Sequence, residues 1–299
     1  MLKKILCPLD GSALAETALD YAAELSIPTG AKLLLVRVAS SHTLPGVDAR
    51  ERKEGAIWEA EDYLTRTAAR LIERGYACEA IAPYGRADEC IVEQARMSAA
   101  DLIVMTTHGR TGPGRLLFGS VAEAVVSNSP VPVLVMRAWL PPHPDDLLRE
   151  TPLFLVPLDG SPFAEAALEP AIKLADEYGA GLLLLCAQRS SADLMDTLGY
   201  LTKLEAKLRD AYPDLRLETD LRDGDAAHAI DEAFRESGAS LVIMATHGRG
   251  GVVRSVTGSV AGRVLKEGHA PVVLVRPPAC AEDIGFAARS EQVGAAGRG

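Results

Sequence analysis

The sequence contains no apolar run that approaches the ~18 consecutive residues needed to cross a bilayer. The apolar run nearest the N-terminus, residues 5–8, is too short for a secretory signal and carries no cleavage pattern. An excess of positive charge is also missing, because the net charge is −10. Nucleic acids and anionic membranes require a basic face, so neither is expected as the main partner. We expect a cytoplasmic protein.

Cysteine is scarce, with five thiols and no CxxC pair. Neither a disulfide framework nor a zinc site is predicted from this spacing. Cys7 and Cys186 lie within apolar runs, which is typical of buried, reduced thiols. This use of cysteine suggests a reducing compartment. The histidines also lack metal-ligand spacing, so no metal site is predicted.

What the chain does have is material for folded cores. Hydrophobic residues make up 48% and charged residues 24% of its 299 positions, which argues against disorder and suggests about two domains. A repeat supports this division, because Pro-Leu-Asp-Gly-Ser at 8–12 recurs 149 residues later at 157–161. Three glycines recur at a separation of 139 residues, namely Gly85, Gly109 and Gly119 as Gly224, Gly248 and Gly258. The first copy therefore has a net ten extra residues, around residues 40–61.

Each copy is predicted to alternate strands and helices. In the first copy, strands are expected at 4–8, 32–38, 77–82, 102–106 and 131–136, and helices at 13–26, 54–73, 87–97 and 120–127. In the second copy, strands are expected at 153–157, 181–187, 216–221, 241–245 and 272–275, and helices at 164–178, 192–211, 225–236 and 259–267. We expect Pro28 and Gly30 to end the first helix.

The aliphatic strands belong to parallel sheets that are covered on both faces. The predicted fold class is therefore α/β, with two tandem doubly wound, five-stranded parallel sheets of Rossmann-like type. The first domain is expected at 1–138, a linker at 139–151 and the second domain at 152–277. Residues 278–299 are expected to form a disordered tail, because they are rich in alanine, glycine and charge.

A glycine-rich loop in each copy is the strongest functional signal. In the first copy it runs from His108 to Gly119 and Ser120, between a buried strand and a helix. A helix start offers unpaired backbone N–H groups and partial positive charge, and glycines let a ligand approach the backbone. Ligands of such sheets bind beyond the carboxyl ends of the strands, so this loop and Asp10 are expected to face one crevice. The pattern predicts a phosphate site.

The order of these motifs resembles the universal stress protein family, in tandem form and with a fold like that of adenine nucleotide α-hydrolases. Both copies carry Pro-x-Asp-Gly-Ser, a strand ending in methionine, nine residues between two loop glycines, and a late Pro-Val stretch. The resemblance covers residues 2–137 and 152–276. The family divides into members that bind ATP and members that do not, and the glycine loop distinguishes the two groups. The resemblance therefore implies that the loops bind ATP (or AMP or ADP), with Mg²⁺ held through the phosphates.

Carried over position by position, the resemblance implies two sets of contacts. The phosphate contacts are Gly109, Gly119, Ser120, Val121, Gly248, Gly258, Ser259 and Val260. The adenine and ribose contacts are Pro8, Leu9, Asp10, Val38, Met105, Pro157, Leu158, Asp159, Ala187 and Met244. His108 and His247 lie in the loops with no acid or nucleophile beside them, which favours a structural or backbone-contact role over catalysis.

One position departs from the family pattern. The first glycine of the loop motif is Thr106 in the first copy and Ala245 in the second. Because a methyl group is the smaller obstacle to a nucleotide, this position favours the second site over the first.

Three interpretations of function stay open at this point. The leading one is an ATP-binding universal stress protein with a regulatory role in the stress response and at most slow ATP hydrolysis. The second is an interaction module with vestigial nucleotide sites. The third, an adenylating enzyme of the related fold, is disfavoured because Asp10-Gly11-Ser12 is shorter than a pyrophosphate loop. Asp10 and Asp159 also have a simpler interpretation as helix caps, which is compatible with ligand binding.

The repeat also predicts an assembly. The family commonly pairs two domains through their last strands, so the two copies are expected to form an intramolecular pseudo-dimer. A homodimer of the whole chain is a further expectation. The protein partner, the stress signal and the physiological nucleotide are not encoded in any motif that we recognise.

Overall fold

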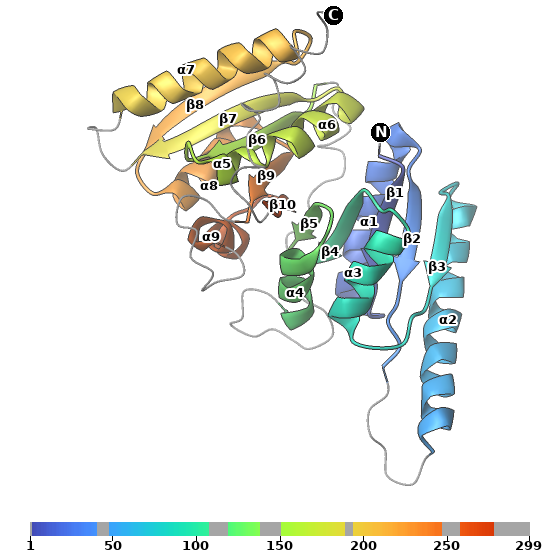
Figure 1. Ribbon diagram of the computed structural model, residues 1–299. Coiled ribbons are helices and arrows are strands. Elements are labelled where there is room, and N and C mark those ends of the chain that lie inside the picture. The colour runs from blue at the N-terminus through green and yellow to red at the C-terminus, as the bar shows by residue number, and fades with distance from the viewer. Residues whose placement is uncertain are drawn as a thin grey trace, which may run out of the picture. The chain divides into compact units, whose positions relative to one another are not determined.

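The computed structural model describes residues 2–40, 48–107, 119–137, 151–188, 194–246 and 258–277 (Figure 1). The chain divides into two compact units, Met1–Pro144 (unit 1) and Asp145–Gly299 (unit 2). The predicted linker, apart from Thr151, and the whole predicted tail lie outside the described residues.

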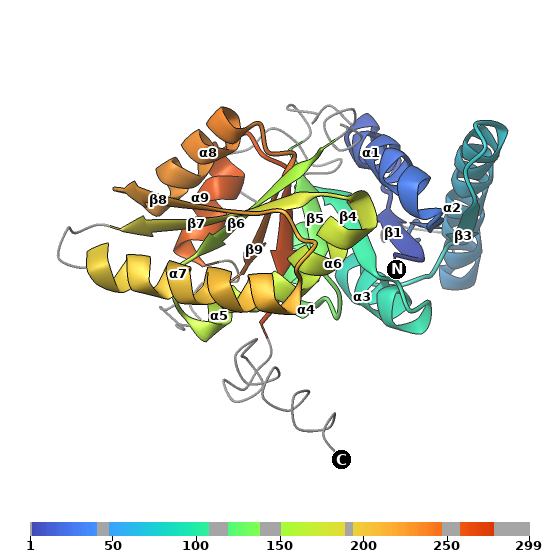
Figure 2. The same ribbon diagram turned by 90° about the horizontal axis from the view of Figure 1, so that it is seen from above.

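Unit 1 contains five parallel strands in the order β3-β2-β1-β4-β5. The strands are β1 (Lys4–Pro8), β2 (Lys32–Val36), β3 (Cys78–Ile81), β4 (Leu102–Thr106) and β5 (Val133–Met136). The helices are α1 (Ala13–Thr29), α2 (Ala49–Glu73), α3 (Ala87–Met97) and α4 (Ser120–Asn128). Figure 2 shows α1 and α3 on opposite sides of the strands, as expected for a doubly wound sheet.

Unit 2 repeats this plan, with strands in the order β10-β9-β6-β7-β8. The strands are β6 (Leu153–Leu158), β7 (Gly181–Gln188), β8 (Leu217–Asp223), β9 (Leu241–Ala245) and β10 (Val272–Val275). The helices are α5 (Pro162–Glu165), α6 (Leu168–Tyr178), α7 (Leu194–Ala211), α8 (Ala226–Ser237) and α9 (Ser259–Glu267). All strand pairs described within the unit are parallel. The predicted fold class is confirmed.

The cores are mainly aliphatic, which agrees with an aromatic content of 5%. The central strands are buried on both faces, because a parallel sheet is covered by helices on each side. Phe154 on β6 and Tyr21 on α1 are the largest fully buried side chains among the described residues. None of the four described cysteines forms a disulfide.

The boundaries differ from prediction at several places with clear local causes. Helix α1 continues through Pro28 and ends at Gly30, whose left-handed φ of 66° lets its N–H bond to the Ser26 carbonyl. Helix α2 begins five residues earlier than predicted, because the Asp48 side chain accepts a hydrogen bond from the Arg50 N–H and caps it. The strand predicted at 32–38 ends at Val36.

The helix predicted at 164–178 is also wrong in one respect. It is divided into α5, which starts at Pro162, and α6, which starts at Leu168. Proline at the first helical position starts α5 early. The Ala166 N–H bonds to the Pro162 and Phe163 carbonyls together, so the turn tightens before α6 begins.

The left-handed cap of α1 gives the first prediction. Gly30→Ala should lower the free energy of unfolding by about 1 kcal/mol, because an L-residue is strained at this φ although the side chain has free space. Gly55→Ala, inside α2 with equally free space, should instead raise the free energy of unfolding by about 0.5–1 kcal/mol. Urea denaturation followed by circular dichroism measures both changes. Equal effects of the two substitutions would contradict the assignment of the α1 terminus.

Candidate functional site

The predicted site residues follow the carboxyl ends of adjacent strands. In unit 1, β1 has β2 on one side and β4 on the other, so the strand order reverses between β1 and β4. In unit 2, the same reversal lies between β6 and β9. Open α/β sheets bind ligands at this point, beyond the carboxyl ends of the two strands. The fold therefore places the Asp-Gly-Ser turn and the end of the methionine strand at one edge.

The Asp-Gly-Ser turns have the same geometry in both units. The Asp10 Oδ1 atom accepts hydrogen bonds from the N–H and the hydroxyl of Ser12, at 2.9 and 2.6 Å. The Asp159 Oδ1 atom accepts the same pair from Ser161, at 2.9 and 2.5 Å. The intervening glycines have φ values of 83° and 76°, in the left-handed region that favours glycine.

The serines, rather than the aspartates, cap the helices that follow. The Ser12 Oγ atom accepts from the Ala15 N–H at 3.1 Å, and the Ser161 Oγ atom accepts from the Ala164 N–H at 3.2 Å. The interpretation of Asp10 and Asp159 as helix caps is therefore wrong. Each aspartate instead orients the capping serine, and it stands half-buried at the end of its strand.

The second part of the edge is the start of α4 in unit 1 and of α9 in unit 2. The N-cap residues are Gly119 and Gly258, and neither helix start has a side-chain cap. The Gly119 N–H donates to the Thr107 carbonyl at 2.7 Å, and the Gly258 N–H donates to the Thr246 carbonyl at 2.5 Å. These bonds hold each helix start, whose first backbone N–H groups have no partner within the helix, against the end of β4 or β9.

The remaining predicted residues divide by burial. Met105 and Met244 are 6% exposed and form part of the strands, as do the buried Leu158 and the half-buried Pro8 and Pro157. Leu9 is buried, while Val38, Val121, Ala187 and Val260 are half-buried and Ser120 and Ser259 are exposed. Thr106 and Ala245 are both 7% exposed at the ends of their strands. His108, Gly109, His247 and Gly248 lie outside the described residues.

Unit 2 has an electrostatic clamp that the sequence reasoning missed. The Arg263 Nη1 atom on α9 lies 2.6 Å from the Asp225 Oδ2 atom at the start of α8. Asp231 on α8 accepts hydrogen bonds from the backbone N–H and the ring Nδ1 of His269, at 2.8 and 2.9 Å. Comparison at the 139-residue separation would have found it, since unit 1 has arginine, alanine, valine and proline at these positions. The clamp ties α9 and the approach to β10 to α8.

The clamp alters the ionisation of both aspartates. The hydrogen bond from Arg263 lowers the pKa of the Asp225 carboxyl against the opposing effect of burial. Burial raises the pKa of Asp231, but the hydrogen bonds from His269 and the charge of Arg235 outweigh it, so the net shift is downward. Both carboxylates are stabilised in the folded protein.

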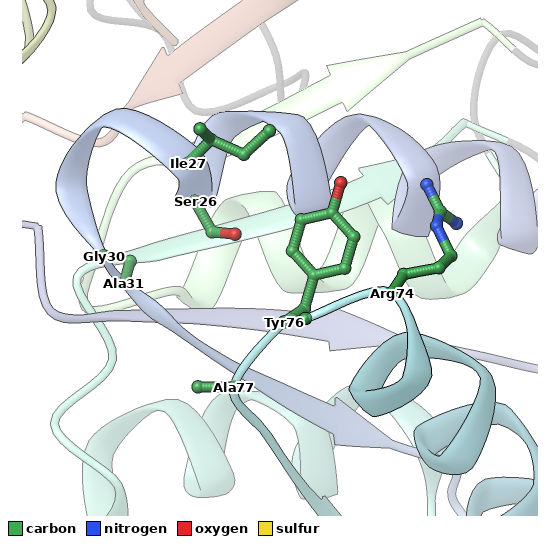
Figure 3. A pocket seen from close by; sticks show the side chains of 8 residues that line it. Ser26, Ile27, Gly30, Ala31, Arg74, Tyr76 and Ala77 are labelled. Carbon is green, nitrogen blue, oxygen red and sulfur yellow. The ribbon is translucent and has the colours of Figure 1, made fainter.

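A pocket of about 350 Å³ lies away from this edge, at the opposite end of unit 1 (Figure 3). It is lined by the end of α1 and the turn that precedes β3, namely Ser26, Ile27, Gly30, Ala31, Arg74, Gly75, Tyr76 and Ala77. The Arg74 guanidinium lies 5.2 Å from the Tyr76 ring centre and binds Asp20 at 3.0 Å. The Tyr76 hydroxyl donates to Glu24 at 3.2 Å. The polar groups of this pocket are thus satisfied within the unit.

Among the described residues, no group of three or more His, Cys, Asp or Glu side chains is placed to hold a metal ion. No helix in the described part of the chain is long and apolar enough to cross a membrane.

Comparison with known proteins agrees with the repeated geometry. The sequence pattern of the universal stress protein family matches residues 1–137 and 153–276. The chain belongs to the universal stress protein family. Both units are universal stress protein domains, and the tandem arrangement predicted from the repeat is confirmed.

Individual relatives support the same assignment. A universal stress protein of Mycobacterium tuberculosis is 27% identical over 319 residues, covering 92% of this chain and 95% of its own length. Another, from Mycolicibacterium smegmatis, is 28% identical over 192 residues, and the match spans only 63% of that relative. A crystal structure of a universal stress protein from Archaeoglobus fulgidus has a TM-score of 0.74 and 22% identity, covering 92% of this chain and 99% of its own. That similarity concerns the fold.

The clamp gives a prediction for stability. Asp231→Ala should lower the free energy of unfolding at neutral pH by about 1–3 kcal/mol, because it removes hydrogen bonds to a partly buried carboxylate. A carboxyl with a lowered folded pKa stabilises the fold above its unfolded pKa, about 3.9, and loses this effect as the pH falls through the folded value. The difference between variant and wild type should therefore shrink in acid. Asp210→Ala, at an exposed position of α7, is the control in urea titrations and should change little.

Proposed function

We propose that each universal stress protein domain binds an adenine nucleotide, ATP in the first instance, and that nucleotide occupancy regulates the protein's role in the stress response. The observation that carries this proposal is the uncapped Gly-Ser helix start, held at the end of β4 in unit 1 and β9 in unit 2. It lies at the reversal of strand order, beside the strand that carries the Asp-Gly-Ser turn.

The helix start supplies the phosphate contacts. The first backbone N–H groups of α4 and α9 have no side-chain cap and carry the positive end of the helix dipole. Ser120 and Ser259 are exposed residues, and their hydroxyls can donate to a phosphate oxygen. Gly109 and Gly248, with His108 and His247, complete the proposed phosphate loop through backbone contacts. Mg²⁺ would be held mainly by phosphate oxygens and water.

The turn at the other side supplies the nucleoside contacts. In both turns, Oδ1 orients the serine, and the carboxylate stands at the strand end where it can accept a hydrogen bond from a ribose hydroxyl. Val38 in unit 1 and Ala187 in unit 2 are half-buried and offer an apolar surface to adenine. Leu9, Leu158, Met105 and Met244 are buried around this position and support it through packing.

The two sites are not equivalent in this proposal. Thr106 and Ala245 occupy the first glycine position of the family motif, and threonine is the larger side chain. The α8–α9 clamp is a feature of unit 2, where it restrains the helix that contacts phosphate. Both differences favour tighter binding by unit 2.

Isothermal titration calorimetry of the intact chain with Mg-ATP tests the proposal. Gly258→Val should weaken binding by about tenfold or more, a loss of about 1.4 kcal/mol, because the side chain would occupy the approach to the helix start. Gly119→Val should cost less. The φ value is −67° at Gly119 and −49° at Gly258, so neither valine is strained by a positive φ.

The matched control is Gly199→Ala in α7, where an added Cβ has free space, and ATP binding should be unchanged. Absence of heat at millimolar ATP for the wild type would reject nucleotide binding and favour the interaction-module interpretation. Equal losses from the two valine variants would reject the ranking of the sites.

Assembly is part of the same proposal. We infer that the two domains form an intramolecular pseudo-dimer through their last strands and that the chain forms a homodimer. Size-exclusion chromatography with light scattering, with and without ATP, measures the mass. A single-chain mass in both conditions would reject the homodimer.

A further inference from the structure

Unit 1 holds a cation behind its Asp-Gly-Ser turn, on the side of the sheet covered by α2. Arg37 follows β2, and its side chain is only 12% exposed. Its guanidinium carbon lies 4.6 Å from the centre of the Tyr63 ring, and Nη2 lies 2.9 Å from the Glu59 Oε1 atom. Nη1 lies 3.3 Å from the point where a Cβ on Gly11 would stand. The guanidinium thus fills the space between α2 and the turn.

The aromatic ring is itself fixed by a carboxylate. The Tyr63 hydroxyl donates to the Glu16 Oε1 atom on α1 at 2.8 Å. Burial and this hydrogen bond raise the pKa of Tyr63 to about 12. The phenol therefore remains neutral, and its ring face is available to the arginine as a cation–π partner.

Unit 2 has residues like those around Arg37, but no cation at the corresponding position. The 149-residue separation places Cys186 at the Arg37 position and Glu165 at the Glu16 position. On the covering helix, the buried leucines of α2 and α7 align at a separation of 137 residues, which matches Tyr63 with Tyr200 and Glu59 with Asp196. Cys186 is 1% exposed and has no charge to offer at the position of the guanidinium.

One buried polar atom in this region, the Oε1 atom of Gln188, has no hydrogen-bond partner among the described residues. Gln188 is 7% exposed, and its Nε2 atom donates to the Asp223 Oδ1 atom at 2.7 Å. Because Gln188 follows Cys186 by two residues in β7, both side chains lie on the same face of the sheet. An unsatisfied buried acceptor destabilises the folded protein, so its retention calls for an explanation.

The surroundings are acidic. Burial raises the pKa of the Tyr200 phenol, and the charge of Glu165, a hydrogen bond with Glu165 and the charge of Asp159 raise it further, so these carboxylates lie within electrostatic reach of the ring. Arg222 on the neighbouring strand does not compensate, because it binds Glu232 and Glu236 on α8. Figure 2 shows α7 and α8 on opposite sides of β7. A planar cation with several N–H donors, such as guanidinium, would donate to the Gln188 Oε1 atom and stack on the Tyr200 ring.

We propose that unit 2 binds a small guanidinium compound between Tyr200 and the end of β7, at the position that Arg37 occupies in unit 1. The planar cation stacks on the Tyr200 ring and donates to Gln188 Oε1 and the Glu165 carboxylate. Guanidinium carries five or six N–H donors in one plane and stacks well on aromatic rings. This site lies on the α7 side of the sheet and does not depend on the proposed nucleotide site.

The probe is methylguanidinium, titrated by calorimetry into the intact chain at low millimolar concentration, with neutral methylurea as the isosteric control. We expect one equivalent of methylguanidinium to bind to the wild type and methylurea not to bind. Cys186→Arg supplies the cation as unit 1 does and should weaken binding at least tenfold. Cys186→Ser preserves size and neutrality and should bind as wild type.

Unit 1 provides a positive control within the same molecule. Arg37→Ala empties the unit 1 position and should add a second equivalent of methylguanidinium, with a concentration-dependent rise in the melting temperature. Tyr200→Phe keeps the ring and should retain most of the affinity, whereas Tyr200→Leu should lose it. Circular dichroism verifies folding, and the tyrosine variants decide the question if Cys186→Arg does not fold.

Three results would overturn the proposal. The first is binding to Arg37→Ala but not to the wild type. The second is equal binding of methylguanidinium and methylurea. The third is binding that appears only when Arg189, which follows Gln188 in the sequence, is replaced by alanine, because the chain's own arginine would then be the occupant.

Discussion

The parallel pairing of β1 with two neighbours, and of β6 with two neighbours, is the constraint on which the rest of each domain depends. Because both neighbours run parallel to it, the carboxyl ends of three strands meet at one edge. The Asp-Gly-Ser turn then has a fixed partner, the helix start anchored to the next strand. This edge has a different helix on each face of the sheet. One face is next to α3 in unit 1 and α8 in unit 2, and the other is next to α2, which carries Tyr63, and α7, which carries Tyr200.

Much of this arrangement could be predicted because it depends on local signals. Aliphatic strands, the Asp-Gly-Ser turn and the glycine spacing are legible in the sequence and occur twice. What could not be predicted depends on contacts between distant residues. The ion pair of Arg263 with Asp225 and the stacking of Arg37 on Tyr63 join elements whose separation along the chain carries no pattern. Hydrogen bonds between near neighbours in the chain cause the α5–α6 break and the early start of α2.

Duplication makes each domain a reference for the other. The turns of Asp10 and Asp159 make the same hydrogen bonds at nearly the same distances. Around these shared turns the side chains diverge, with Arg37 against Cys186 on one side and an ion-paired α9 in unit 2 on the other. The two domains therefore share the geometry of this edge and differ in the side chains that lie beside it.

The backbone bonds from Gly119 to Thr107 and from Gly258 to Thr246 have a consequence for loop entropy. Each bond joins the two described residues that flank an intervening segment, residues 108–118 or 247–257, so the ends of that segment lie close together. The closure entropy of that segment is thereby lost when the domain folds and not when a ligand arrives. Since closure entropy grows only logarithmically with length, insertions in these segments should be tolerated without weakening the anchor itself.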